Sequence, residues 1–363
     1  MKIACIVGAR PNFMKIAPIL EEIEKHPDLD PILVHTGQHY DYEMSQVFFE
    51  DLDIPEPHVH LGVGSGSHAI QTGKIMMAFE EVVLEHKPDL VLVVGDVNST
   101  LACSLVAAKL WIPVAHVEAG IRSFDRTMPE EINRLLTDVI SDYLLTPTED
   151  ANENLKKEGI SDRKIFLVGD VMIDTLLKYK DKASSDSMLS DLGLEKHSYI
   201  LMTLHRPNNV DVESNFVKIL NALAEIQRLI KIVFPIHPRT KARIEEFGFG
   251  NMVSGMENLI IIDPLGYLKF MGLMVNSRFV LTDSGGMQTE TTVLNIPCLT
   301  MRENTERPET IREGTNTLVG NDTHLIIEES TKILDGYGKT GIYPEIWDGH
   351  TAERIVKTIA HIS

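Results

Sequence analysis

The sequence predicts an α/β protein made of two doubly wound, Rossmann-like domains. Short apolar runs alternate with longer stretches of helical periodicity along almost the whole chain, which is the pattern of parallel βαβ units. Eleven such runs are too many for one parallel sheet, and a chain of 363 residues exceeds the length at which a single core usually divides. A polar segment at residues 178–196 separates the runs into two series, so we expect domains at 1–180 and 181–349.

Each apolar run is assigned as a strand because strands that are buried on both faces read as continuous apolar segments. The expected strands are Lys2–Val7, Pro31–Thr36, Leu90–Gly95, Val114–Glu118, Tyr143–Thr146, Ile165–Val168, Tyr199–Leu204, Ile232–Ile236, Leu259–Ile262, Phe279–Thr282 and Pro297–Thr300. Helical spacing predicts helices over His68–His86 and Thr351–Ile362. The last helix follows a crossing rich in Gly, Pro and Trp, and we expect it, at about 350–363, to pack back on the first domain.

Composition excludes several classes of protein. Lys and Arg number 34 against 53 Asp and Glu, and the resulting net charge of −19 argues against nucleic acid and anionic membranes as partners. No apolar run approaches the roughly 20 residues of a membrane span. The chain enters its first strand directly after Met1, without the features of a signal peptide, so we expect a cytoplasmic protein. Three widely separated cysteines suggest neither disulfides nor a zinc site.

Two glycine-containing segments follow or precede predicted elements, where nucleotide motifs occur. Gly62-Val-Gly-Ser-Gly66 lacks the third glycine of the dinucleotide fingerprint and has no acidic residue after a following strand, so a flexible loop is the better interpretation. Gly8-Ala-Arg-Pro11 fits neither that fingerprint nor a P-loop. We therefore expect no bound nicotinamide and no other cofactor.

Polar residues follow one strand after another. Ligands of doubly wound sheets bind outside the carboxyl ends of the strands, so these positions are the candidates for a functional site. They are Arg10, Gln38-His39, Asp96, Glu118, His205, His237 and Asp283-Ser-Gly-Gly286. Each could merely cap a following helix, but a set of this size is hard to explain by capping.

Three carboxylates stand out in the first half of the chain. Asp96 could simply cap the next helix, whereas Glu118 ends an apolar strand and has no helix directly after it. Glu130 follows Pro129 at a predicted helix start and lies four residues before Arg134, so a surface ion pair is the alternative. Carboxylates gathered at a leaving group would serve as acid, base and electrostatic stabiliser.

The segment after the tenth strand has the pattern of a phosphate site. Ser284, Gly285 and Gly286 precede a predicted helix, whose free amides would attract a pyrophosphate, although a helix cap with a glycine turn is equally compatible. Glu290 could accept hydrogen bonds from both ribose hydroxyls, or it could be merely solvated.

Further candidates lie near the same edge. Arg302 and Arg307 could meet phosphate charge or pair with neighbouring glutamates at the surface. His205 could steady a departing phosphate as an imidazolium, although a histidine after a strand is more often a hydrogen-bonded structural residue. Phe270 could stack on a base, with core packing as the alternative.

Seven segments together resemble the non-hydrolysing UDP-N-acetylglucosamine 2-epimerases, in order and over nearly the whole chain. They are Gly8-Ala-Arg-Pro11, Gly95-Asp96, His116-Val-Glu-Ala-Gly120, Pro129-Glu-Glu-Ile-Asn-Arg134, Leu204-His-Arg206, Leu281-Thr-Asp-Ser-Gly-Gly286 and the stretch from Arg302 to Pro308. The resemblance implies a glycosyltransferase-B-like pair of domains with the active site in the interdomain cleft. It also implies a homodimer that interconverts UDP-N-acetylglucosamine and UDP-N-acetylmannosamine without a redox cofactor.

The resemblance also implies roles for particular residues. The catalytic residues would be Asp96, Glu118, Glu130 and His205, with His205 at the diphosphate. The substrate-binding residues would be Arg10, Lys15, Phe270, Ser284, Gly285, Gly286, Glu290 and Arg307. No metal is implied.

The expected reaction is epimerisation at C2 by elimination and re-addition of UDP through 2-acetamidoglucal. The hydrogen on C2 is a poor acid, and departure of UDP from C1 creates an oxocarbenium-like centre that makes this hydrogen more acidic. Relatives on the same scaffold epimerise other UDP-2-acetamido sugars, which remains an alternative. A UDP-sugar glycosyltransferase and a catalytically silent sugar-nucleotide sensor are two others.

Overall fold

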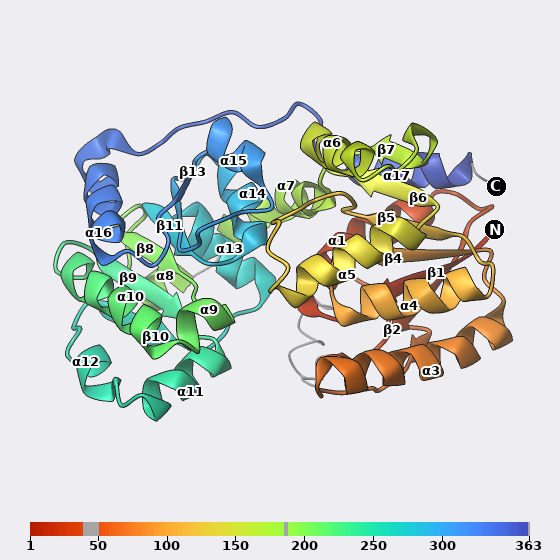
Figure 1. Cartoon of the computed structure of the whole chain (residues 1–363). Helices are drawn as coiled ribbons and strands as arrows, with labels where there is room; N and C mark the ends of the chain where they lie inside the picture. The colour runs from red at the N-terminus through yellow and green to blue at the C-terminus, as the bar shows by residue number, and fades with distance from the viewer. Residues whose placement is uncertain (39–50, 185–187, 362–363) are drawn as a thin grey trace. The chain divides into compact units, whose positions relative to one another are not determined.

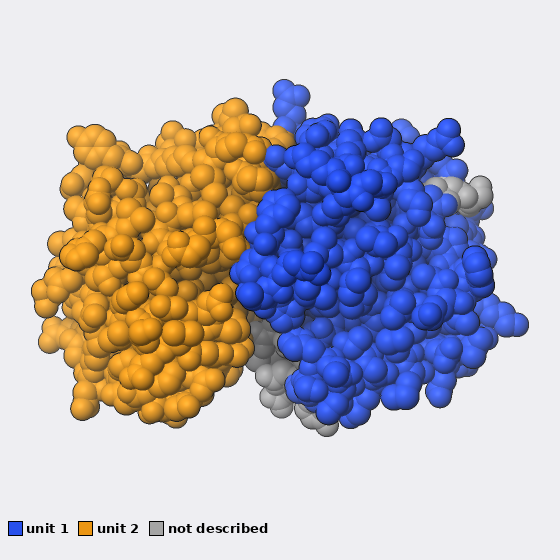
Figure 2. Space-filling view, in the orientation of Figure 1, with its two compact units in different colours: residues 1–178, 345–363 blue, residues 179–344 orange. Residues whose placement is uncertain are grey.

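The chain forms two compact units, which we call unit 1 and unit 2 (Figure 2). Unit 1 consists of residues 1–178 and 345–363, and unit 2 of residues 179–344. The structure, a computed structural model, describes residues 1–38, 51–184 and 188–361. Each unit is an α/β body with its own parallel sheet, as the alternation of apolar runs and helical stretches predicts.

Unit 1 is built on a seven-stranded parallel sheet of strand order β3-β2-β1-β4-β5-β6-β7. Its strands are β1 Lys2–Val7, β2 Asp30–His35, β3 Val59–His60, β4 Leu90–Val94, β5 Val114–Val117, β6 Tyr143–Thr146 and β7 Ile165–Leu167. The order reverses direction between β1 and β4, so the loops after these two strands separate at the carboxyl edge. A doubly wound sheet offers its ligand site at such a point.

Helices cover the sheet of unit 1 (Figure 1). They are α1 Arg10–Ile23, α3 His68–His86, α4 Asn98–Lys109, α5 Pro129–Ile140, α6 Glu149–Lys157, α7 Val171–Ser184 and α17 Thr351–Ala360, with a short 3₁₀ turn at Asp162–Lys164. The central strands are apolar and fully buried; all five residues of β4 are examples. This explains why their sequences read as continuous apolar runs.

The C-terminal helix α17 belongs to unit 1, where it packs against α1 (Figure 1). Its buried face carries Ile355, Val356 and Ile359. The backbone amides of Thr351 and Ala352 donate to the carboxylate of Asp174, at 3.1 and 2.7 Å. Asp174 thus satisfies free amides at the start of α17 from a helix that lies far away in the sequence.

Unit 2 is built on a six-stranded parallel sheet of strand order β10-β9-β8-β11-β12-β13. Its strands are β8 Tyr199–Met202, β9 Lys231–Pro235, β10 Leu259–Ile262, β11 Phe279–Thr282, β12 Cys298–Thr300 and β13 Asn316–Leu318. Its helices are α8 Met188–Asp191, α9 Pro207–Val210, α10 Glu213–Ile226, α11 Pro238–Glu246, α12 Gly250–Ser254, α13 Tyr267–Val275, α14 Gly285–Val293, α15 Pro308–Arg312, α16 Thr323–Lys332 and a π turn at Ile333–Tyr337. The order reverses between β8 and β11, where His205 and Ser284 follow the strands.

The eleven predicted strands are confirmed, with ends that differ by no more than two residues. Two further strands, β3 and β13, were missed. β3 (Val-His) and β13 (Asn-Thr-Leu) are short and contain polar residues, so neither reads as an apolar run, unlike the equally short edge strand β7 (Ile-Phe-Leu). The polar segment 178–196 contains the end of α7 and the short helix α8. Across the described part of the chain, no helix has the length and apolarity of a membrane span.

Candidate active site

Asp96 follows β4 and is held by an arginine from α5. Its Oδ2 accepts a hydrogen bond from Arg134 Nη2 at 2.5 Å, and its side chain is 27% exposed. The capping interpretation of Asp96 is wrong, because Val97 occupies the N-cap of α4 and the Ser99 amide in its first turn donates to Gln38. The capping interpretation overlooked Arg134, which is 38 residues away in sequence.

Glu118 follows β5 and is buried in an ion pair with Lys15 of α1. Its backbone has a φ of 73°, a left-handed conformation that is uncommon for a residue with a long side chain. A Cβ on the neighbouring Gly95 would lie 3.1 Å from Lys15 Nζ and 3.6 Å from Glu118 Oε2. Glycine at this position therefore leaves room for the ion pair, and the left-handed backbone turns Glu118 toward Lys15.

Glu130 lies in the first turn of α5, where Pro129 is the first helical residue, as predicted. The proposed surface pair between Glu130 and Arg134 is wrong. Arg134 is buried and donates instead to Glu131 and Asp96. The side chain of Glu130 is half-buried, and the described part of the chain contains no ion pair that involves it.

Glu131 was missed by the sequence interpretation. It is 1% exposed, and its two oxygens accept hydrogen bonds from the amides of Ser123 and Phe124, from the Ser123 hydroxyl and from Arg134. The only signal in the sequence was its position three residues before Arg134, which is as compatible with a helical contact as the four-residue spacing of Glu130.

His116 of β5 supports the turn that carries Asp96. Its Nδ1 lies 2.6 Å from Asp138 Oδ1, and its Nε2 lies 2.8 Å from the carbonyl oxygen of Gly95. Asp138 also meets Arg122 at 2.7 Å. Burial raises the pKa of Asp138, but the neighbouring His116 and Arg122 outweigh this effect and hold the pKa below its usual value. The carboxylate is therefore charged. It holds the His116 ring, which in turn contacts the carbonyl oxygen of the Gly95–Asp96 turn.

Two other predicted positions of unit 1 follow β1 and β2. Arg10 is the first residue of α1, and the structure does not describe its side chain. Gln38 accepts hydrogen bonds from the amide and the hydroxyl of Ser99, at 3.0 and 2.7 Å, at the start of α4. His39 lies outside the described residues.

Ser284, Gly285 and Gly286 form the N-terminus of α14 in unit 2, as predicted. Ser284 occupies the N-cap, but its side chain forms no capping hydrogen bond, which disfavours the helix-cap alternative. A Cβ on Gly285 would lie 2.1 Å from Glu306 Oε1, so a larger residue there would displace the Glu306 carboxylate that pairs with Arg302. Gly286 is exposed, and a Cβ there would meet nothing within 4 Å. The Ser284 amide donates to Thr282 Oγ1 at 2.9 Å, so the potential anion site consists of the amides of Gly285 and Gly286.

Glu290 and Phe270 lie on two helices of unit 2. Glu290 is 4% exposed and accepts a hydrogen bond from the Tyr267 hydroxyl at 2.8 Å, so the interpretation of Glu290 as a solvated residue is wrong. Tyr267 opens α13, and Phe270 lies one turn further along with a half-buried side chain. Tyr267 orients the Glu290 carboxylate, a contact that the sequence did not indicate.

Arg302 and Arg307 are both buried, contrary to the surface network considered as an alternative. Arg302 does pair with a glutamate: its Nη2 lies 2.7 Å from Glu306 Oε2, and both side chains are largely buried. Glu306 is the same residue that approaches Gly285. Arg307 occupies the N-cap position of α15 and is 3% exposed.

His205 follows β8 and is fixed by Asp283, which follows β11. The Asp283 carboxylate accepts hydrogen bonds from the backbone amides of His205 and Arg206. One of its oxygens also lies 3.1 Å from His205 Nδ1. Burial raises the pKa of Asp283, but His205 and these amides outweigh it and lower the pKa below its usual value. The charged Asp283 therefore holds His205 Nδ1 as a donor. The imidazole is 40% exposed and lies 5.5 Å from the ring of His237.

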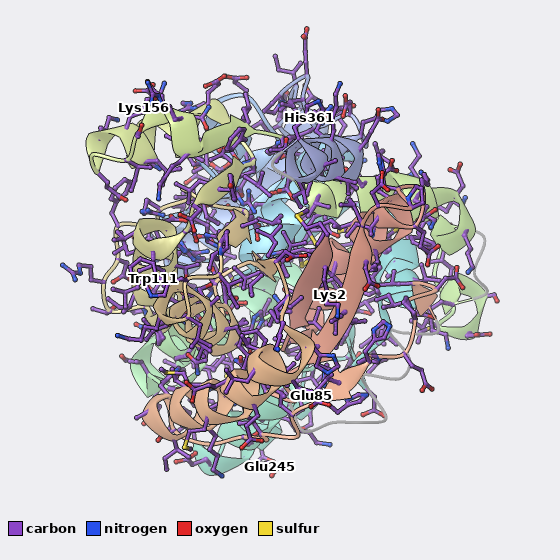
Figure 3. All side chains as sticks on the ribbon, turned by 90° about the vertical axis from the view of Figure 1, so that its right-hand side faces the viewer. Lys2, Glu85, Trp111, Lys156, Glu245 and His361 are labelled. Atoms are coloured by element: carbon purple, nitrogen blue, oxygen red, sulfur yellow. The ribbon has the colours of Figure 1, made fainter. Side chains whose placement is uncertain are left out.

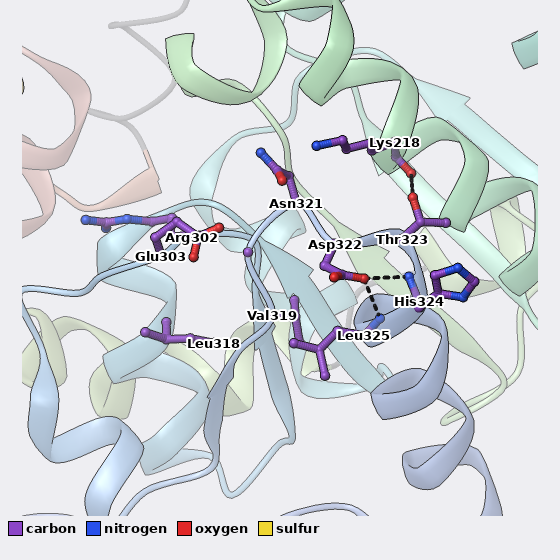
Figure 4. A pocket seen from close by; sticks show the side chains of 11 residues that line it. Lys218, Arg302, Glu303, Leu318, Val319, Asn321, Asp322, Thr323, His324 and Leu325 are labelled. Atoms are coloured by element: carbon purple, nitrogen blue, oxygen red, sulfur yellow. Dashed lines mark hydrogen bonds between the residues drawn. The ribbon is translucent and has the colours of Figure 1, made fainter.

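Two cavities lie near these residues within the separate units. In unit 2, a cavity of about 650 Å³ lies after β12 and β13 and is lined by Lys218, Arg302, Glu303 and the loop that leads into α16 (Figure 4). In this loop, the Asp322 carboxylate accepts hydrogen bonds from the amides of His324 and Leu325. The cavity includes Arg302 but none of the residues to which the resemblance gives a substrate-binding role, so we do not assign the nucleotide to it. In unit 1, a cavity of about 530 Å³ lies between α3 and α5 and includes Asn98 and Asn133.

The two Rossmann-like units, one with carboxylates after its strands and the other with a glycine-containing helix N-terminus, have the glycosyltransferase-B-like fold. A sequence model of the family described as UDP-N-acetylglucosamine 2-epimerase matches residues 21–360. The chain belongs to the UDP-N-acetylglucosamine 2-epimerase family and is an epimerase.

Three similar proteins illustrate the relationship. A UDP-N-acetylglucosamine 2-epimerase homolog of Methanococcus maripaludis is 47% identical, and the match covers 100% of this chain and 100% of that protein. A UDP-2,3-diacetamido-2,3-dideoxy-D-glucuronate 2-epimerase of Pseudomonas aeruginosa is 46% identical over 94% of this chain and 93% of its own. The crystal structure of Methanocaldococcus jannaschii UDP-GlcNAc 2-epimerase in complex with UDP-GlcNAc and UDP has 43% identity and a TM-score of 0.92, covering 99% of this chain and all of its own.

Proposed function

We propose that the protein interconverts UDP-N-acetylglucosamine and UDP-N-acetylmannosamine by inverting C2. The observation that carries the proposal is the group of carboxylates after β4 and β5 and at the start of α5. Asp96 and Glu118 are each paired with a buried cation, whereas Glu130 is half-buried with no ion pair among the described residues. A similar protein whose crystal structure contains UDP-GlcNAc supports the choice of sugar.

We assign UDP to unit 2. Phosphate oxygens would accept hydrogen bonds from the amides at the start of α14. Arg307 and His205, which lie in other loops of unit 2, would supply positive charge. Glu290, oriented by Tyr267, would accept from the ribose hydroxyls, and Phe270 would lie against the uracil. The predicted set also includes two cations of unit 1, Arg10 and Lys15, of which Lys15 pairs with Glu118.

The proposed chemistry is an elimination followed by an addition. The C1–O bond breaks and UDP leaves with its electron pair, while a carboxylate removes the C2 proton and the C–H electrons form the C1–C2 double bond of 2-acetamidoglucal. UDP then adds back to C1, and C2 receives a proton on the opposite face. Among Asp96, Glu118 and Glu130, one carboxylate would remove the C2 proton, another would deliver a proton to the opposite face, and their negative charge would stabilise the oxocarbenium-like centre.

The test is incubation of the purified protein with UDP-N-acetylglucosamine alone in deuterated water, followed by NMR at C2. We expect the epimer to carry solvent deuterium at C2, and slowed variants to release UDP and 2-acetamidoglucal. Epimer that retains its original C2 hydrogen would contradict elimination. UDP released only together with free sugar would instead indicate hydrolysis.

A second substrate must be tested beside the first. The relative from Pseudomonas aeruginosa, whose name specifies a UDP-2,3-diacetamido-glucuronate, is 46% identical to this chain, so identity alone does not separate the two sugars. The same NMR experiment with that nucleotide sugar decides between them. Higher kcat/KM on the diacetamido uronate would replace our assignment of the sugar and keep the epimerase chemistry.

We also propose the homodimer that the resemblance implies. Apolar side chains of unit 1 are exposed on α3, where Ile70, Met77 and Leu84 recur every seven residues and therefore share one face. Helix α4 packs against both α3 and α5, and exposed Leu136 and Val139 lie on α5 (Figure 1). A second copy that packs on these helices would bury this surface.

A further inference from the structure

We infer that Glu131 and Arg134 form a positioning pair that holds Asp96 in its reactive orientation. The inference rests on the proposed function, in which Asp96 contacts the reacting sugar. It assigns roles to two residues that themselves need not touch the substrate.

Arg134 is the link between two carboxylates. Its Nη1 donates to Glu131 Oε2 at 2.9 Å and its Nη2 donates to Asp96 Oδ2 at 2.5 Å, while the guanidinium is almost completely buried. A planar guanidinium that bridges two acceptors has a fixed orientation, which a flexible ammonium would not have. The position of the Asp96 carboxylate therefore depends on that of Arg134.

Glu131 in turn fixes Arg134 and the loop before α5. Besides Arg134, it accepts the amide and hydroxyl of Ser123, at 3.0 and 2.9 Å, and the amide of Phe124 at 3.0 Å. Phe124 adopts a left-handed backbone with a φ of 59°, and its side chain is 75% exposed. A buried carboxylate with donors on both oxygens holds this loop in an otherwise unfavourable conformation.

The backbone of Asp96 is held from the same helix. Asn133 Nδ2 donates to the Asp96 carbonyl oxygen at 2.9 Å, and His116 holds the preceding carbonyl of Gly95. The one contact on the Asp96 side chain comes from Arg134, as far as the described residues show. A carboxylate on a fixed backbone with one oxygen bound to a buried cation presents its other oxygen in a defined direction.

The test is a double-mutant cycle on kcat. Arg134→Lys keeps the charge but loses the bridge between the two carboxylates, and we expect it to lower kcat by about 10- to 100-fold with little change in KM. In an Asp96→Asn background, the same substitution should lower kcat by no more than about twofold, because the group that it positions is already absent. A purely structural role would instead give losses that multiply in the double variant, and that result would overturn the inference.

A second variant guards against misfolding. Glu131→Gln cannot accept from all four donors, and we expect the same split of a lowered kcat and a nearly unchanged KM. Asp348→Asn is the matched control, because Asp348 also accepts two hydrogen bonds from one arginine of unit 1, Arg354, at 2.9 and 2.8 Å. The control should keep wild-type kcat, and a loss equal to that of Glu131→Gln would contradict a specific role.

Calorimetric titration with UDP and far-UV circular dichroism check that each variant is folded. A wild-type protein that turns over neither sugar nucleotide would reject the proposed function and the positioning role with it. A wild-type protein that is active, with unchanged kcat in folded Arg134→Lys, would reject the positioning role alone.

Discussion

At the scale of single residues, three carboxylates differ in what surrounds them. Glu118 forms a buried ion pair with Lys15, Asp96 is bound by Arg134 and remains partly exposed, and Glu130 has no ion pair in the described part of the chain. Removal of the charge therefore has different consequences for stability at each position, even where the effect on the reaction is the same. Breaking a buried pair leaves a buried charge uncompensated.

We expect Asp96→Asn, Glu118→Gln and Glu130→Gln each to lose about 10²- to 10⁴-fold in turnover. Glu118→Gln should also lower the free energy of unfolding by about 3 kcal/mol because Lys15 loses its partner, whereas Glu130→Gln should stay within about 0.5 kcal/mol of wild type. Steady-state kinetics and urea unfolding measure the two effects. Wild-type turnover in any one variant would remove that residue from the mechanism.

Asp348 gives a prediction on pH. The carboxylate meets the Arg354 guanidinium at 2.8 and 2.9 Å, and mainly this hydrogen bonding lowers its pKa to about 2. A lowered pKa means that the ionised form stabilises the folded state, so the stabilisation is complete above the unfolded-state pKa of about 4 and is lost as pH falls toward 2. Asp348→Asn should cost about 0.5–1 kcal/mol at pH 7, since the pair is partly exposed and screened.

Urea unfolding of wild type and Asp348→Asn at several pH values from 7 downward checks this expectation. The difference between them should shrink below pH of about 4. Asp28→Asn, at an exposed aspartate in the same unit, is the control and should show no such trend. A difference that is constant with pH would show that the ion pair does not stabilise the fold.

At the scale of elements, the ends of helices explain several unusual backbone conformations. Helix α3 ends at Lys87, whose φ of 49° and ψ of 59° are left-handed, and whose amide donates to the Val83 carbonyl. Glycine is the usual residue in this conformation because it lacks the Cβ that causes the strain. Helix α4 is followed by Trp111, which is also left-handed, with a φ of 61°.

Lys87→Gly should therefore increase the free energy of unfolding, by about 0.5–1 kcal/mol, since relief of the left-handed strain exceeds the added flexibility of the unfolded chain. Lys74→Gly is the matched control: it makes the same substitution at an exposed position inside α3 and should lower stability by about 1 kcal/mol. Urea or thermal unfolding gives both values. Destabilisation by Lys87→Gly would mean that the lysine side chain contributes more than its backbone conformation costs.

At the scale of the whole molecule, the open question is the assembly. Unit 1 exposes apolar side chains on neighbouring helices, and Trp111 at the end of α4 is 93% exposed (Figure 3). Isolated exposed apolar residues are common, but residues at seven-residue intervals on one helix lie on the same face. Leu229, one of several exposed apolar residues of unit 2, lies in a turn and serves as the comparison for the α3 face.

We expect the wild-type protein to be a dimer in sedimentation equilibrium and Met77→Lys to be a monomer, because a charge on the α3 face cannot be buried without a partner. Leu229→Lys adds the same charge elsewhere and should remain a dimer. A monomeric wild type would contradict the homodimer, and a dimeric Met77→Lys would place the interface on another surface. The cytoplasmic location stays a prediction.

The sequence by itself determined the fold class and the central strands, because strands buried on both faces must be apolar throughout and this requirement is local. β4 at Leu90–Val94 and β11 at Phe279–Thr282 are examples. It also indicated which positions follow the strands, since that depends only on where each apolar run ends. The edge strands β3 and β13 were missed because both are short and neither is an apolar run, whereas β7, with three residues at another edge, is apolar throughout.

Only the tertiary structure decided which side chains are partners. Glu130 and Glu131 are neighbours in sequence, and either spacing to Arg134 suits a helix, but Glu131 is the one that faces the protein interior. In the same way, Asp96 meets an arginine 38 residues away, and Asp283 holds His205 from a strand 78 residues further on. Such pairs form because packing brings distant elements together, and a local pattern holds no information about a contact at that separation.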